Sequence, residues 1–198
     1  MTFISDSLNR IKPSATMVIT AKATQLKREG KKVIGLSSGE PDFDTPQHVK
    51  QAAIDAINSG YTKYTNIEGI PELRQSIVEK FKKDNDLNYD VSNVIVGTGG
   101  KQILFNALMS SLNKDDEVII PAPYWVSYPD MTLLAGGKPV FVNCSSETNF
   151  KLTAEALEKV ITKNSKWLIL NSPSNPTGSC LSLIHISEPT RPERIAYA

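Results

Sequence analysis

Several features that mark other classes of protein are scarce or missing in this sequence of 198 residues. Two cysteines, Cys144 and Cys180, are too few for the disulfide framework of a small secreted protein. The net charge is only +1, so composition gives no electrostatic argument for nucleic-acid binding. No apolar run approaches the roughly 18 residues of a membrane span, and the first residues contain no signal-peptide core. We therefore expect a cytoplasmic protein with no membrane or nucleic-acid partner, and we assign no metal site.

The order of the predicted elements is that of an α/β protein. A hydrophobic fraction of 40% is enough to build a packed core. Short apolar runs predict strands at 33–36, 93–98, 117–120, 139–142 and 167–171. Helical patterns cover 18–26, 47–59, 71–81, 101–112, 127–134 and 154–161. Strands separated by helices predict parallel pairing with right-handed crossovers, and we place a boundary near Thr45 between an N-terminal arm and a larger domain.

Residues 181–198 do not continue this pattern. They contain two prolines and two arginines and show no clear periodicity. Residues 181–191 resemble one reading frame of a transposase adapter used in sequencing libraries. We interpret 181–198 as an artefactual tail that lies outside the fold. The alternative is a natural, divergent C-terminus.

A glycine-rich segment, residues 97–102, has the sequence Gly-Thr-Gly-Gly-Lys-Gln and joins a predicted strand to a predicted helix. Glycines let backbone N–H groups approach an anion closely, and a helix N-terminus adds about half a positive charge. The segment matches neither the dinucleotide-binding fingerprint nor a Walker loop. It is either a phosphate-binding turn or a turn selected for packing.

Two further segments, residues 121–128 and 171–178, follow predicted strands, and open α/β sheets place their ligands at the carboxyl ends of strands. In the first, Trp125 could stack on a planar ring, or it could be a core tryptophan. In the second, two prolines restrict the backbone, and Asn175 could donate its amide to a ring oxygen. An ordinary Pro/Asn turn is the alternative reading of the second segment.

A fourth segment, residues 38–46, is rich in Ser, Gly, Pro and Asp. Its Gly39 could offer a backbone N–H to a substrate carboxylate. Its acidic residues could equally form a solvated cluster at the start of a helix.

In their order and spacing, the four segments resemble the class I aminotransferases that use pyridoxal phosphate. The resemblance is strongest to the bacterial branch of aspartate aminotransferases, whose members often also transaminate prephenate, and it extends from about Arg10 to Gly178. It implies the type I fold of pyridoxal-phosphate-dependent transferases, an α/β fold that is truncated here. Residues 1–45 would be the N-terminal arm and the start of the small domain, and residues 46–180 part of the cofactor-binding large domain with a mostly parallel sheet.

The resemblance also implies the chemistry. The complete protein would be a homodimer that moves the amino group of aspartate or glutamate to 2-oxoglutarate, oxaloacetate or, as a candidate, prephenate. The residues that would contact the cofactor are Gly99, Gly100 and Lys101 at its phosphate, Trp125 on its ring, Asn175 at its phenolic oxygen, and Tyr64 at the phosphate in the other subunit. The residues that would contact the substrate are Gly39, Trp125, Asn175, Lys101, Lys12, Ser14 and Thr16. Lys101 could instead support the phosphate, and Lys12 could be a plain surface lysine.

The chain departs from the family in what it lacks. Subunits of this family are much longer, and the lysine that forms the Schiff base, the aspartate at the pyridine nitrogen and the arginine at the α-carboxylate have no counterpart here. Lys163 and Lys166 precede the last predicted strand, and Arg191 and Arg194 lie in the suspected tail. We therefore assign no catalytic residue and expect this chain to be inactive alone. The alternatives are a non-catalytic phosphate- or cofactor-binding fragment, and an incomplete sheet that aggregates and has no function.

Overall fold

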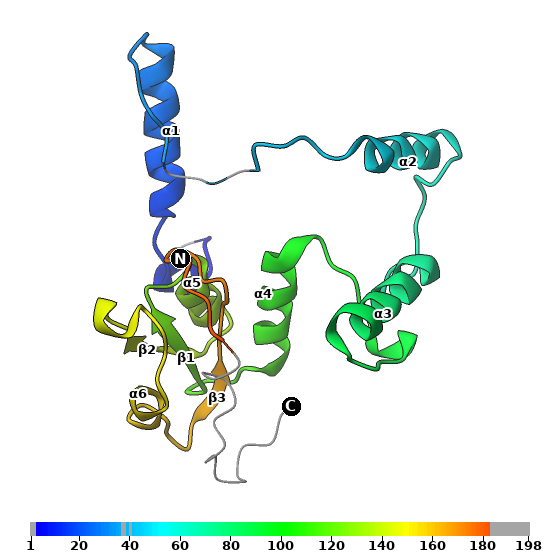
Figure 1. Ribbon diagram of the computed structural model, residues 1–198. Helices are drawn as coiled ribbons and strands as arrows, with labels where there is room; N and C mark the ends of the chain where they lie inside the picture. The colour runs from blue at the N-terminus through cyan, green and yellow to red at the C-terminus, as the bar shows by residue number, and fades with distance from the viewer. Residues whose placement is uncertain (1–2, 37–38, 40, 183–198) are drawn as a thin grey trace. The chain divides into compact units, whose positions relative to one another are not determined.

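The structure is a computed structural model that describes residues 3–36, 39 and 41–182, so nearly all of the suspected tail lies outside the described residues. The backbone forms two compact units, one made of Met1–Ser14 and Leu104–Ala198 and the other of Ala15–Ile103. Each unit is described by itself (Figure 1). The domain boundary expected near Thr45 stays a prediction.

The first unit is built on a parallel sheet with strand order β2-β1-β3. The strands are β1 (Glu117–Ala122), β2 (Lys138–Asn143) and β3 (Ser165–Leu168). The helices are η1 (Asp6–Arg10), α5 (Ser127–Leu134), η3 (Ser146–Thr148), α6 (Ala154–Glu158) and most of α4 (Gly99–Ser111). The first four residues of β1 are buried, as expected for a central parallel strand covered on both faces. The predicted α/β class and parallel pairing are therefore confirmed.

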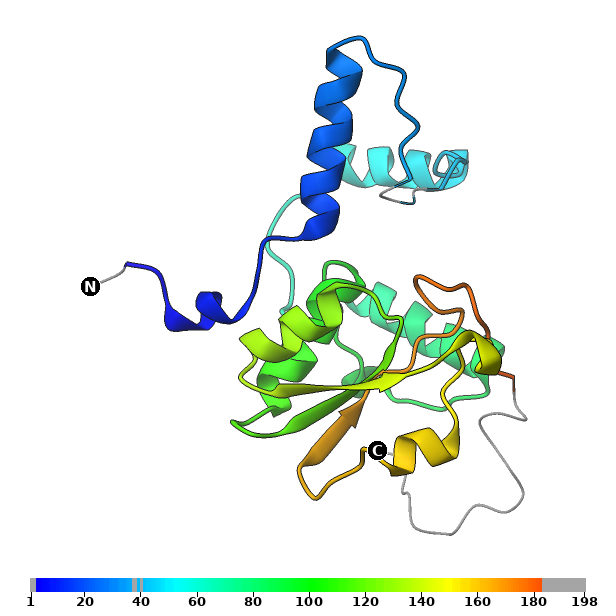
Figure 2. The same ribbon diagram turned by 90° about the vertical axis from the view of Figure 1, so that its left-hand side faces the viewer.

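The core of this unit lies between β1 and the helices α4 and α5. Val118 and Ile120 are fully buried, and because side chains alternate along a strand they share one face of the sheet. Leu108 of α4 and Met131 of α5 pack against them, and α5 runs along the sheet in Figure 2. At the edge of this cluster, the Trp167 indole N–H donates to Ser111 Oγ over 2.9 Å.

The second unit consists of α1 (Ala15–Arg28), α2 (Gln47–Asn58), α3 (Pro71–Asn85) and η2 (Val91–Asn93). Pro71 occupies the first position of α3, where its missing N–H costs no helical hydrogen bond. The guanidinium of Arg74 joins α3 to the segment around η2, since its Nε donates to Val94 O over 2.9 Å and its Nη2 to Val91 O over 2.5 Å. These bonds hold Val94, a buried residue of this unit, in place.

The predictions of strands at 33–36 and 93–98 were wrong. Ile34 and Leu36 are 89% and 93% exposed, so nothing in the described part of the chain covers their apolar run. Around 93–98, η2 occupies the first residue, and the backbone bond from Val96 N to Glu68 O, 2.9 Å long, does not extend into a ladder. An apolar run becomes a strand only where a second strand pairs with it. Among the predicted ends that moved, β3 ends at Leu168 and α6 at Glu158, each earlier in the chain than predicted.

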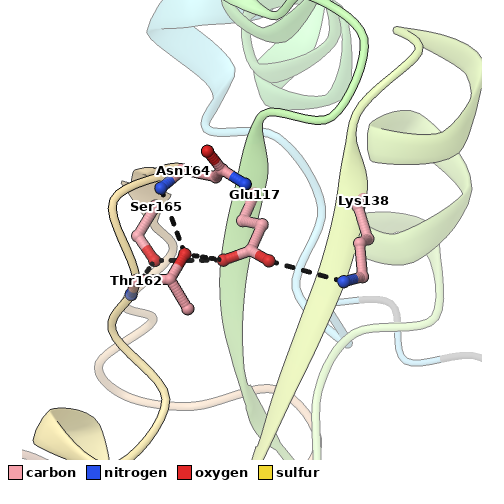
Figure 3. A network of polar contacts seen from close by, with 5 residues as sticks. All are labelled: Glu117, Lys138, Thr162, Asn164 and Ser165. Carbon is pink, nitrogen blue, oxygen red and sulfur yellow. Dashed lines mark hydrogen bonds and ion pairs between the residues drawn. The ribbon is translucent and has the colours of Figure 1, made fainter.

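A polar network joins the three strands at the amino end of the sheet (Figure 3). Its centre is the carboxylate of Glu117, which is 6% exposed. Thr162 Oγ1 donates to Glu117 Oε2 over 2.6 Å, Ser165 Oγ to the same oxygen over 3.3 Å, and Lys138 Nζ to Oε1 over 3.4 Å. These groups favour the ionised carboxylate, the Thr162 hydroxyl most, so they hold the pKa of Glu117 below its ordinary value of 4.5 although burial opposes them.

The network predicts an acid-sensitive contribution to stability. Because the pKa of Glu117 is lower in the folded than in the unfolded chain, this contribution is complete above the unfolded value and is lost as pH falls through the folded value. Glu117→Gln should lower the free energy of unfolding near neutral pH and flatten its decline between about pH 6 and about pH 3, measured by urea unfolding. The same substitution at exposed Glu147 is the matched control. Equal pH slopes for Glu117→Gln and the unsubstituted chain would contradict the assignment.

Candidate functional site

Two of the predicted ligand segments meet at the carboxyl edge of the sheet. Because β1 and β3 are adjacent and parallel, the chain leaves both at the same edge. A small pocket there is lined by residues of both segments, among them Tyr124, Tyr128, Asn171, Ser174 and Asn175. Its volume of about 40 Å³ is far below the roughly 300–1,000 Å³ of small-molecule sites, so the pocket marks where the loops meet and is not itself a ligand cavity.

The aromatic side chains after β1 are held in fixed orientations. Trp125 is partly buried against the core cluster, and its ring meets Tyr128 edge-on with centroids 5.4 Å apart. Tyr124 stacks on Phe141 with centroids 5.0 Å apart, and burial raises the pKa of the Tyr128 phenol above its ordinary value of 10.0. Trp125 thus makes the contacts expected of a core tryptophan. Its stacking on a cofactor ring stays a prediction.

The loop after β3 is closed by its own hydrogen bonds. Ser174 N donates to Ser179 O over 2.9 Å, and Gly178 N to Ser174 O over 2.7 Å. The N–H of Asn175 donates to the side-chain Oδ1 of Asn171 over 2.7 Å. The Asn175 side chain itself is exposed and lines the pocket. The loop is therefore held in shape by its own hydrogen bonds and leaves Asn175 exposed, and the ring contact predicted for Asn175 stays a prediction.

The glycine-rich segment lies in the other unit and opens α4. The helix begins at Gly99, whose φ of +77° favours glycine, and Gln102 Oε1 accepts a hydrogen bond from Thr98 N. A Cβ added at Gly99 or Gly100 would meet no atom within 4 Å, so the backbone is open to a ligand. Gly99 N donates to Gly97 O over 3.0 Å within the turn. The first turn of a helix has further N–H groups without helical carbonyl partners, and these attract anions. The residues present therefore fit a phosphate group.

The other predicted site residues are exposed or partly exposed. Lys101 is exposed in the first turn of α4, Tyr64 is fully exposed between α2 and α3, and Gly39 is exposed in the segment before α2. Lys12 and Ser14 are exposed between η1 and α1, and Thr16, in the first turn of α1, is partly buried. The roles predicted for these residues stay predictions.

Sequence reasoning missed Tyr124 and Asn171. Tyr124 was overlooked because its neighbour Trp125 is the larger ring, yet Tyr124 lines the pocket. Asn171 stands four residues before Asn175, and an asparagine at the start of a loop often accepts a nearby backbone N–H. That spacing was the available signal.

Across the described residues, no group of three or more His, Cys, Asp or Glu side chains could hold a metal ion. In the same part of the chain, no helix is long and apolar enough to cross a membrane.

Polar loops at the carboxyl edge of a parallel sheet are a common place for ligands in α/β proteins, and a glycine-rich helix start is a common place for anions. The family model described as aminotransferase class I and II matches residues 31–188. The chain therefore belongs to the class I and II aminotransferase family, and the resemblance found in the sequence is confirmed.

Individual relatives agree with this assignment. The aspartate/prephenate aminotransferase of Cereibacter sphaeroides is 62% identical over 90% of this chain and 45% of its own length. The aspartate aminotransferase structure from Rhizobium meliloti is 51% identical with a TM-score of 0.89, covering 94% of this chain and 46% of that one. The aspartate aminotransferase from Thermus thermophilus with maleate is 47% identical with a TM-score of 0.88, covering 91% and 47%. The chain thus spans about half the length of the relatives it matches, and its fold is that of pyridoxal-phosphate-dependent aspartate aminotransferases.

Gly97 and Gly100 of the glycine-rich segment differ in the space that an added side chain would find. A Cβ at Gly97 would lie 2.5 Å from Ile103 Cδ1 and 3.1 Å from Gln102 Oε1, whereas the space around Gly100 is open. The ends of the Ile103 and Gln102 side chains must move in Gly97→Ala, and Gln102 Oε1 accepts the Thr98 N–H, so the start of α4 should lose about 1 kcal/mol through that hydrogen bond. Gly100→Ala should leave it as stable or slightly more stable, because alanine favours helix. Hydrogen exchange of residues 97–103 measures both, and wild-type exchange in Gly97→Ala would refute the predicted clash.

Proposed function

We propose that a full-length protein carrying this sequence is a pyridoxal-phosphate-dependent aminotransferase. It moves the amino group of aspartate or glutamate to a 2-oxo acid such as 2-oxoglutarate or oxaloacetate, with prephenate as a further candidate. The observation that carries the proposal is the open glycine start of α4 in a chain of the class I and II aminotransferase family. The name of the Cereibacter sphaeroides relative supports the reaction and two of the substrates, aspartate and prephenate.

The residues of this chain fit the cofactor by their chemistry. Backbone N–H groups at Gly99, Gly100 and Lys101 would hold its phosphate, because the helix start favours negative charge. Trp125 would stack on the ring, and the exposed amide of Asn175 would donate to the ring's phenolic oxygen. When bound, pyridoxal phosphate supplies an electron sink for negative charge that develops at the substrate's α-carbon.

The substrate side of the proposal rests on charge. An acidic amino acid brings two carboxylates, and a buried carboxylate is costly without a cation or strong donors nearby. Gly39 would offer its backbone N–H to one carboxylate. Lys101, Lys12, Ser14 and Thr16 are the candidates for the other, with the phosphate as the rival partner of Lys101. The Thermus thermophilus structure contains maleate, which is itself a dicarboxylate, and this supports an acidic substrate.

The assembly is also part of the proposal. Tyr64 is fully exposed, which suits a side chain that reaches the cofactor phosphate of another subunit. The active form would then be a homodimer with shared sites. We also propose a cytoplasmic location.

We assign no residue of this chain to three roles. They are a lysine that moves the proton at the substrate's α-carbon, an acid partner for the pyridine nitrogen, and a cation for the α-carboxylate. Lys163 and Lys166 lie before or within β3, at the amino end of the sheet, where Lys166 Nζ pairs with Asp116 Oδ2 over 2.9 Å. Neither lysine can therefore serve the carboxyl edge, and we propose that this chain alone does not catalyse the reaction.

The test is turnover with aspartate and 2-oxoglutarate in the presence of pyridoxal phosphate. The 198-residue chain should show no transamination above free cofactor, and the full-length protein should show enzyme-level rates. Enzyme-level turnover by the purified 198-residue chain would contradict the proposed division of roles. Cofactor binding by that chain without turnover would instead identify it as the non-catalytic binding fragment.

A further inference from the structure

The loop between β3 and Leu181 satisfies its backbone groups in two ways. Pro173 and Pro176 contribute no N–H. Ser174 N and Gly178 N donate to backbone carbonyls of the loop itself. Side-chain oxygens accept the other N–H groups of the loop: Ser179 N donates to Thr177 Oγ1 and Leu181 N to Ser172 Oγ.

Asn175 is held differently from its neighbours. Its N–H donates over 2.7 Å to a side-chain oxygen, Oδ1 of Asn171. Because only the carbonyl end of an asparagine amide accepts a hydrogen bond, this contact also fixes which way the Asn171 amide points. The peptide on the amino side of Asn175 is thus oriented by one side chain, and the following residue, Pro176, offers no second donor.

Asn171 is in turn tied to the sheet. Two residues before it, Ile169 N donates to Ile119 O over 3.0 Å, so the chain is still bonded to β1 at that point. Asn171 and Asn175 both line the small pocket at the carboxyl edge. A continuous path of short contacts therefore runs from the central strand through Asn171 to the backbone of Asn175.

We propose that Asn171 is a positioning residue for cofactor binding: its Oδ1 holds the backbone of Asn175 so that the Asn175 amide is already aimed at the ring of pyridoxal phosphate. This rests on the function proposed above for Asn175. Prior orientation matters because a side chain that must be ordered on binding loses affinity to conformational entropy. Asn171 itself need not touch the cofactor.

Thr177 provides a matched control for the possibility that Asn171 only stabilises the loop. Thr177 Oγ1 accepts the N–H of Ser179 over 3.2 Å, which is the same kind of side-chain-to-backbone bond in the same loop. Thr177→Val removes that bond and leaves the Asn171–Asn175 contact intact. Asn171→Leu removes the acceptor at nearly constant size, and Asn171→Asp keeps an acceptor oxygen.

The experiment uses the full-length protein, with the dissociation constant of pyridoxal phosphate and the amide exchange rate of Asn175 as readouts. Loss of a hydrogen bond of about 1.4 kcal/mol corresponds to about tenfold in either quantity. Asn171→Leu should weaken cofactor binding about tenfold and speed Asn175 exchange about tenfold in the cofactor-free protein. Asn171→Asp should restore the exchange rate. Thr177→Val should change exchange at Ser179 and leave cofactor affinity as it was.

A double-mutant cycle decides whether Asn171 acts through Asn175. Asn171→Leu combined with Asn175→Ala should bind the cofactor no more weakly than Asn175→Ala alone. Additive losses, or unchanged Asn175 exchange in Asn171→Leu, would overturn the positioning role while leaving the proposed function intact. If Asn175→Ala alone leaves cofactor affinity unchanged, the cofactor role of Asn175 fails, and the inference fails with it.

Discussion

Parallel hydrogen bonding of β1 to both of its neighbours is the constraint on which the rest of the sheet unit depends. The register pairs Val118 with Pro139 of β2 and with Trp167 of β3, and it sends the chain out of β1 and β3 at the same edge. The same strand supplies Val118 and Ile120 to the core beneath α4 and α5. The position of both ligand loops therefore follows from burial of one apolar strand.

The amino and carboxyl ends of the sheet carry different kinds of residues. At the amino end, Glu117 and its donors from β2 and from the turn before β3 hold the three strands together with charge-assisted contacts. At the carboxyl end, the loops around Trp125 and Asn175 present polar and aromatic groups instead. The strands that carry these loops are fixed at the amino end of the sheet, so the loops can be rich in polar and aromatic groups. In this way an α/β fold places ligand-binding groups on a rigid support.

The sequence predicted the elements whose partners lie near them in the chain. The helix that begins at Pro71 and the strands at 117–120 and 139–142 were placed correctly, because capping and apolar runs are local signals. The run at 33–36 failed because strand formation depends on a partner that local sequence does not specify. For the site, composition and spacing identified the loops and Asn175, but the bond from Asn171 Oδ1 to the Asn175 backbone depends on the folded loop and emerged only from the structure.

We propose above that backbone N–H groups at the glycine start of α4 bind the phosphate of pyridoxal phosphate in the full-length protein. A crystal structure of the full-length protein with this cofactor bound tests it most directly. We expect the phosphate on the backbone N–H groups of Gly99 to Lys101 and the Asn175 amide on the ring's phenolic oxygen, with Asn171 still bonded to the Asn175 backbone. A cofactor bound away from the glycine-rich turn, or an Asn175 side chain that does not touch it, would contradict the account.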